Sequence, residues 1–270
     1  MGGSPRRGRP LLACAFAPFG LQAHKPARLT SLRLGSKSTG QMSGYFPDTT
    51  LMYFCDEGIA LRQRPLRDND RIVTVFTRKH GKLEVNFKGV RRARARLRAL
   101  SESVTYSDYR FYLKKTSNFP VCTGGKVISV FNGIRLSREK LFSAFYFNEL
   151  LMSLTPAAQP AEKKFELLLS ALRRAEEVPR VPRALLVAYA LILIEYCGIG
   201  FKHTNIGVDS GIWEALHDPS FSKVEELEKL AGSQALDSAA DLAVKKIREH
   251  ASREINTLKF VKIYKAEIGE

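Results

Sequence analysis

The chain has 270 residues, of which 44% are hydrophobic, a content typical of a globular protein with one large domain or two small ones. Its formal net charge is +16, which favours a polyanion as partner. No segment reaches the roughly 18 apolar residues of a membrane-spanning helix, so we expect no association with a membrane.

Neither the cysteines nor the known catalytic motifs indicate a chemical site. Cys14, Cys55, Cys122 and Cys197 are far apart, without the clustered spacing of a zinc site or the density of a disulfide framework. Isolated thiols of this kind fit a reducing cytoplasm. Phosphate-binding loops, nucleophile elbows and HExxH motifs are absent from the sequence. We therefore expect no catalytic residue, no metal and no cofactor, and a protein that is not an enzyme.

Residues 1–51 form a basic extension. Residues 1–41 contain seven Lys and Arg and no Asp or Glu. A charged start followed by a short apolar run is typical of a signal or transit peptide. An early start codon is the other interpretation, since Met42 and Met52 offer later starts. We expect this extension to be disordered or outside the native chain, and to take no part in the fold.

Residues 52–133 carry strand signals. In Lys82–Lys88, apolar and polar residues alternate, so Leu83, Val85 and Phe87 should share one face. Five short strands in about eighty residues suit a small closed barrel, because closure removes exposed sheet edges. The predicted strands are Gly58–Arg62, Arg71–Thr77, Lys82–Lys88, Val104–Leu113 and Val121–Phe131.

Residues 134–270 change to helical spacing. Ser137 can cap the first helix, and Thr155-Pro156 ends it. The segment Ala184–Ile194 holds no charge and should form a buried core helix. Strands followed by helices predict an α+β chain, with an N-terminal five-stranded barrel domain at 52–133 and an all-α helical domain at 134–270. The further helices are expected at about 161–176, 182–197, 222–231 and 237–252.

The charge of the barrel domain is concentrated. Residues 62–98 hold thirteen Lys and Arg against three acids, and Lys88–Arg98 alone holds six cations and no acid. A solvated face with no partner normally mixes the two signs. This asymmetry predicts contacts to a phosphate backbone, which carry no base specificity. The candidate phosphate-binding residues are Arg71, Lys88, Arg91, Arg92, Arg94 and Arg96, with Arg78, Lys79, Lys82 and Arg98 as further candidates.

Aromatic residues of the fourth predicted strand could stack on bases. Alternation puts Tyr106 and Tyr112 on one face of the strand and Tyr109 and Phe111 on the other. We expect one of these pairs to lie in the barrel core, which leaves the other for stacking.

Three stretches resemble the bacterial recombination mediator family RecO. Glu57-Gly-Ile-Ala-Leu61, then Asp70-Arg-Ile-Val-Thr-Val-Phe-Thr-Arg-Lys-His-Gly-Lys82, then Lys88-Gly-Val-Arg-Arg92 are similar to the family's opening strand, second strand with its turn, and following turn. The resemblance covers about forty residues. The helical half is only broadly similar, as in Leu191–Gly200, and the extension has no counterpart.

The resemblance implies an N-terminal OB-fold and a mediator that binds single- and double-stranded DNA and anneals complementary strands. It also implies cooperation with RecR in loading RecA onto DNA covered by single-stranded-DNA-binding protein, in the cytoplasm at the nucleoid. Many members carry a four-cysteine zinc motif where this chain reads Phe201–Gly211 without cysteine, so zinc is not carried over. Two alternatives remain open: an adaptor that docks the acidic tail of a partner, and an RNA-binding OB-fold protein.

Overall fold

The computed structural model describes residues 51–114, 117, 119–201, 209–230 and 233–258. All of them belong to one compact unit, residues 40–270. The predicted extension lies outside the described residues, except for Leu51, which begins the first strand.

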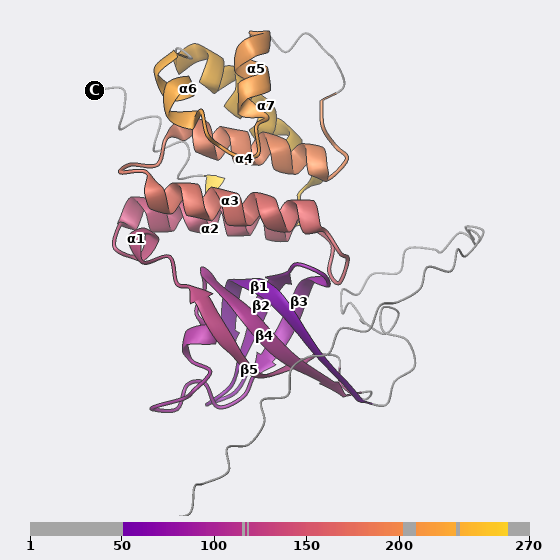
Figure 1. Cartoon of the computed structure of the whole chain (residues 1–270). Coiled ribbons are helices and arrows are strands. Elements are labelled where there is room, and N and C mark those ends of the chain that lie inside the picture. Colours follow the sequence, from indigo (N-terminus) through magenta and orange to yellow (C-terminus); the bar gives the residue numbers. More distant parts are fainter. Residues whose placement is uncertain (1–50, 115–116, 118, 202–208, 231–232, 259–270) are drawn as a thin grey trace, which may run out of the picture. The chain divides into compact units, whose positions relative to one another are not determined.

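Five strands close into a barrel in the order β1-β2-β3-β5-β4 (Figure 1). Neighbouring strands are antiparallel except β3 and β5, which pair in parallel at Asn86 and Val121. This topology confirms the predicted five-stranded OB-fold, although the first strand begins at Leu51 rather than at Gly58. The strands are β1 (Leu51–Pro65), β2 (Arg71–Thr77), β3 (Gly81–Phe87), β4 (Thr105–Lys114) and β5 (Val121–Ser129).

The barrel interior follows the alternation of the sequence. Leu83, Val85 and Phe87 are all fully buried in it, as predicted. Gly58 of β1 belongs to the same packing, because a Cβ atom there would lie 2.7 Å from Val75 Cγ1 and 3.2 Å from the Tyr109 ring. A side chain at this position would therefore force the small barrel open.

Helices make up the rest of the described chain, which confirms the α+β class. Ser137 caps α2 as predicted, its Oγ accepting from the Lys140 amide at 3.4 Å, and Thr155 ends that helix. Two short helices, α1 and α5, were not predicted from the sequence, and α7 begins at Ser233 rather than near 237. The helices are α1 (Asn132–Arg135), α2 (Arg138–Leu154), α3 (Glu162–Glu177), α4 (Arg183–Tyr196), α5 (Ser210–Leu216), α6 (Val224–Leu230) and α7 (Ser233–His250), with a short 3-10 helix η1 (Ala99–Ser101) before β4.

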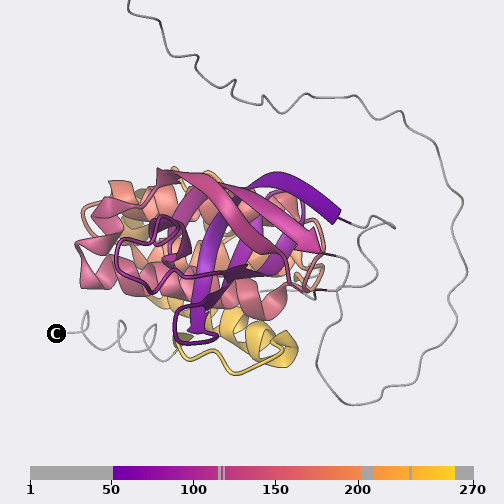
Figure 2. The ribbon, with the colours of Figure 1, turned by 90° about the horizontal axis from the view of Figure 1, so that it is seen from below.

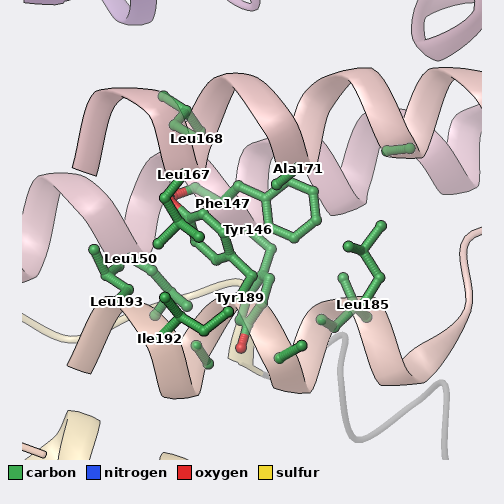
Figure 3. Packing of buried hydrophobic residues seen from close by; sticks show 14 of the residues in the cluster. Tyr146, Phe147, Leu150, Leu167, Leu168, Ala171, Leu185, Tyr189, Ile192 and Leu193 are labelled. Carbon is green, nitrogen blue, oxygen red and sulfur yellow. The ribbon is translucent and has the colours of Figure 1, made fainter. Parts of the chain in front are cut away.

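The centre of the helical part is α4. Every residue from Arg183 to Ile194 is buried, as expected for a helix that is apolar on all sides. Its Tyr189 hydroxyl donates to the Phe147 carbonyl of α2 at 3.1 Å, so the polar end of this buried ring has a partner. Figure 3 shows Tyr189 among side chains of α2, α3 and α4, including Tyr146, Phe147, Leu150, Leu167, Leu168, Ala171, Leu185, Ile192 and Leu193.

The helical core continues onto the outside of the barrel. Phe76 of β2 and Tyr106 of β4 are buried in the same cluster as Phe165 of α3, with ring centroids 6.3 and 6.2 Å from that of Phe165. These two side chains lie outside the barrel interior, which has a separate cluster of its own. Helix α3 thus covers apolar surface that an isolated barrel would expose to water.

Arg78 fixes this contact electrostatically. Its guanidinium lies 4.7 Å from the centre of the Phe165 ring, pairs with Glu57 of β1 at 3.2 Å and forms an ion pair with Glu166 of α3. Burial alone lowers the pKa of Arg78, but the hydrogen bond and negative charge of Glu166, with Tyr106 and Glu57, raise it above its ordinary value. The guanidinium therefore stays charged and joins β1 to α3.

The turn between β2 and β3 is pressed against the α2–α3 connection. The Lys82 ammonium donates to the carbonyls of Met152, at 2.7 Å, and Thr155, and so satisfies the C-terminal end of α2. The Ala158 amide donates to the Lys82 carbonyl at 2.9 Å. Gly81 has φ +69°, and a Cβ atom on it would lie 2.0 Å from the Gln159 carbonyl oxygen. Only glycine fits this contact between the barrel and the helices.

Replacing Gly81 by Ala should destabilise the protein strongly. The substitution adds the cost of a left-handed backbone, about 1 kcal/mol, to a clash with the Gln159 backbone, and we expect a total loss of about 3 kcal/mol or more in the free energy of unfolding. Urea unfolding followed by circular dichroism measures it.

Gly89 supplies the matched control for this prediction. It has a similar φ of +66°, but the nearest atom to an added Cβ is Arg92 Cδ at 3.9 Å. Gly89→Ala should therefore cost only the backbone term, about 1 kcal/mol. Equal losses for the two variants would contradict a tight contact at Gly81.

Stability at alkaline pH should depend on Lys82. Burial and the nearby positive charge of Arg253 together lower the pKa of its ammonium to about 8, although Glu84 opposes them. The ammonium loses its proton near pH 8 in the folded state and near 10.4 in the unfolded state. Between these values the unfolded chain binds the extra proton, so rising pH favours the folded state.

The comparison variant is Lys82→Met, which lacks the titrating group. From pH 7 to pH 10 the unfolding free energy of the wild type should rise relative to this variant by about 1–2 kcal/mol. This rise is smaller than for a fully buried group, because the ammonium keeps part of its contact with water. A constant difference between the two proteins would show that the pKa of Lys82 is not lowered.

Candidate nucleic-acid interface

The cationic run Lys88–Arg98, called the arm below, begins at the end of the barrel remote from the helices. Phe87, the last residue of β3, pairs with Arg71, the first of β2, whereas the other ends of these two strands form the turn that touches α2 and α3. Seven residues of strand separate the two ends by about 20 Å. Figure 2 views the barrel from below and shows the purple connection between β3 and β4 that contains the arm.

The arm is a chain of turns and not an extended strand. The amides of Arg92, Ala95 and Arg98 each donate to the carbonyl three residues earlier, at 3.2 to 3.3 Å, and the Ser101 amide continues the series into η1. Arg94 takes a left-handed backbone, with φ +61°. The alternating Arg-x-Arg spacing therefore does not place these side chains on one face, because they follow the turns of a loose coil.

Apolar and backbone contacts hold this coil to the barrel. Val90 and Leu100 are buried in the barrel core, and the Tyr109 hydroxyl donates to the Leu100 carbonyl at 3.0 Å. The Gly89 amide donates to Asp70 Oδ1 at 2.7 Å, and the Arg91 amide donates to the Asn69 carbonyl at 3.1 Å. The loop between β1 and β2 thus fixes the start of the arm.

The cations of the arm have no acidic partner among the described residues. Each of the six is exposed, and none forms an ion pair with a described carboxylate. The Arg91 guanidinium donates to the Arg67 carbonyl, at 3.5 Å. The exposed Arg62, Arg64 and Arg67 lie on the adjoining end of β1 and its loop, where Arg64 pairs with Glu84 at 3.1 Å. The members of the arm are Lys88, Arg91, Arg92, Arg94, Arg96 and Arg98.

The remaining candidate residues are distributed differently. Arg71 pairs with Glu102 at 2.9 Å and donates to Ser101 Oγ at 3.3 Å, so it holds η1 against β2. Arg78 and Lys82 are committed to the helices, as described above. Lys79 is exposed, but at the turn end of the barrel. The structure thus places Arg71 at the same end as the arm, where it is paired with Glu102, and places Arg78, Lys79 and Lys82 at the opposite end.

The aromatic prediction needs correction. Tyr109 and Phe111 fill the barrel core, but Tyr106 is also buried, beneath α3, with its hydroxyl donating to Glu57 at 2.6 Å. Only Tyr112 keeps partial exposure. The outer face of β4 is divided because α3 covers one end of it, a long-range contact that alternation along one strand cannot show.

Sequence reasoning also missed Tyr53. It lies directly opposite Tyr112 on β1, with ring centroids 4.8 Å apart, and 73% of it is exposed. The sequence did not place Tyr53 on a strand, because the first strand was predicted to begin at Gly58. Extending the period-two pattern back to Leu51 would have revealed it.

The exposed cations at this end of the barrel are guanidinium and ammonium groups. Guanidinium and ammonium groups hold phosphate by charge-assisted hydrogen bonds. Among the described residues, no group of three or more His, Cys, Asp or Glu side chains is placed to hold a metal ion. The described helices also include none long and apolar enough to cross a membrane.

Two family models match this chain in succession. The model for the N-terminal part of recombination protein O covers residues 52–145, and the model for its C-terminal part covers residues 135–206. Together they span more than half of the sequence and both parts of the fold.

Several proteins named DNA repair protein RecO are similar to the chain. That of Symbiobacterium thermophilum is 32% identical over 142 residues, which are 53% of this chain and 55% of the relative. The Bacillus subtilis protein is 33% identical over 121 residues, 45% and 47% of the two chains. The Streptomyces coelicolor protein is 30% identical over 144 residues, 51% and 58%. The chain thus spans about half the length of the curated relatives it matches, and with both family models in order it belongs to the RecO family.

Proposed function

We propose that this chain is a DNA repair protein that binds single- and double-stranded DNA through the arm and anneals complementary strands. The observation that carries the proposal is the set of six exposed cations without acidic partners among the described residues, held at one end of an OB-fold barrel. Membership of the RecO family and the names of the relatives support the same function.

Annealing requires no catalytic group. Two single strands repel each other through their phosphates, and a cationic surface that holds both of them lowers this repulsion. Bases on the two strands can then meet and pair. Phosphate contacts do not read base sequence, so one such surface serves any complementary pair of strands.

The wider role follows the family resemblance. In this proposal the chain works in the cytoplasm at the nucleoid, acts on DNA covered by single-stranded-DNA-binding protein, and cooperates with RecR in loading RecA. No enzyme activity is included, because holding and neutralising strands makes and breaks no covalent bond.

Removing four charges from the arm should weaken DNA binding and reduce its dependence on salt. The variant changes Arg91, Arg92, Arg94 and Arg96 to Ala, side chains that make no described ion pair and whose loss should leave the fold intact. If each contacts one phosphate, the slope of log affinity against log salt should fall by about 3 to 4. Fluorescence anisotropy with labelled oligonucleotides at several salt concentrations measures the slope.

A control variant removes the same charge from the helical part. Its four exposed positions carry no described ion pair, and all become Ala: Lys163, Arg173, Lys229 and Lys245. This variant should keep most of the salt slope. If both variants lose the same slope, net charge rather than the arm governs binding.

Strand annealing should follow the same order. With complementary single strands coated by single-stranded-DNA-binding protein, wild type should speed duplex formation, more at about 50 mM than at about 200 mM salt. The arm variant should anneal more slowly at both concentrations, and a fluorescence-quenching pair on the two strands reports the rate. Annealing by the arm variant at the wild-type rate would refute the proposed role of the arm.

A further inference from the structure

A pair of tyrosines lies on the outer face of the barrel, away from both cores. Tyr53 of β1 and Tyr112 of β4 are directly opposite in the antiparallel register, with their rings tilted by 39° and their centroids 4.8 Å apart. The neighbours Phe54 and Phe111 point the other way and pack inside the barrel. Tyr53 is the most exposed of the large aromatic side chains in the described residues.

Cations flank this pair along the strand. Arg110 and Lys114 stand two residues before and after Tyr112, so they share its face at a distance of about 7 Å on either side. Both are exposed, and neither forms an ion pair with a described residue. The Arg110 guanidinium lies over the bare backbone of Gly124 on β5, since a Cβ atom there would be 3.7 Å from its Nε.

The pair lies at the same end of the barrel as the arm. Tyr112 is paired with Val121 at the start of β5, and Val121 in turn is the partner of Asn86, two residues before Lys88. Three strand spacings separate β1 from β3 by this route, about 14 Å along the barrel surface. A single strand held by the arm can therefore continue onto the tyrosine face.

We propose that Tyr53 and Tyr112 form a stacking platform for unpaired bases of single-stranded DNA, with Arg110 and Lys114 holding the adjoining phosphates. The inference rests on the proposed DNA-binding function and adds a surface on β1 and β4, distinct from the arm. Exposed aromatic rings interleaved with cations are the combination that binds single strands without sequence preference. Bases inside a duplex have their faces covered by neighbours, so this platform discriminates single from double strands.

With this platform, a DNA strand would make different contacts with the protein before and after it pairs. The arm neutralises phosphates of either kind of DNA, whereas the rings hold only a strand whose bases are unpaired. Once the bases pair with a second strand, their faces stack within the duplex and leave the tyrosines. The product is then held by the arm alone, which favours its release.

The test replaces both rings by Leu, which keeps the outer face apolar and cannot stack. Tyr53→Leu/Tyr112→Leu in the full chain should bind a single-stranded oligonucleotide about tenfold more weakly than wild type at every salt concentration, with the salt slope unchanged. Its affinity for the matching duplex should stay within about twofold. Tyr53→Phe/Tyr112→Phe is the matched control, and it should bind both DNAs like wild type.

Three results would overturn the platform: no change for single strands, an equal loss for single strands and duplex, or a reduced salt slope. An unchanged affinity for single strands would mean that the tyrosines contact a protein partner or only stabilise the pairing of β1 with β4. Because wild type is measured in parallel, failure of the proposed function is distinct: wild type would then bind neither DNA.

Photocrosslinking of the wild type tests the platform without any variant. An oligonucleotide with 5-iododeoxyuridine, irradiated in complex with the full chain and analysed by mass spectrometry, should give adducts on Tyr53 or Tyr112. Adducts confined to residues 88–98 or to other parts of the chain would count against the platform.

Discussion

The structure depends on the covered face of the barrel. Phe76 and Tyr106 carry apolar rings on the outside of a closed sheet, and both are buried in the helical core, where Phe165 of α3 packs against them. Arg78 completes the contact by pairing with Glu57 of the barrel and Glu166 of the helix beside the same ring. Removing either partner would leave apolar surface in water and a charge without its counter-ion. Barrel and helices are therefore expected to fold as one unit, in which the helices cover one end of the barrel and no described helix covers the other.

The two ends of the barrel separate cations that lie close together in the sequence, within residues 62–98. Arg78 and Lys82 sit at the covered end, where carboxylates and helix carbonyls take up their charge. Lys88 and the arginines after it begin at the opposite end, where none of them forms an ion pair with a described carboxylate. A local net charge cannot make this distinction, since it counts both groups alike. The strand length between them, about 20 Å, decides which cations remain available to a polyanion.

The apolar and polar pattern along the chain predicted which residues of a single strand or helix are buried. Alternation placed Leu83, Val85 and Phe87 in the barrel core, and an uncharged run predicted the central helix α4. The failures have a common cause in long-range contact. Tyr106 is buried although its alternation partner Tyr112 is not, because α3 covers only one end of β4. Tyr53 was missed because its strand begins at Leu51, before the predicted start at Gly58, and its pairing with Tyr112 becomes visible only in the register.

The family resemblance and the DNA proposal rest partly on different residues, since only Lys88–Arg92 belongs to both. Glu57-Gly58 and the turn at Gly81-Lys82, which carry much of the resemblance, serve the barrel interior and its contact with the helices. Gly58 leaves room for Val75 and Tyr109, and Gly81 leaves room for the Gln159 backbone. These positions are constrained by packing whatever the barrel binds, so they identify the fold without locating an interface. The charged side chains of the arm and the tyrosine pair belong to neither core, although Val90 anchors the arm in the barrel. Their exposed charge and rings are better explained by a partner outside the chain.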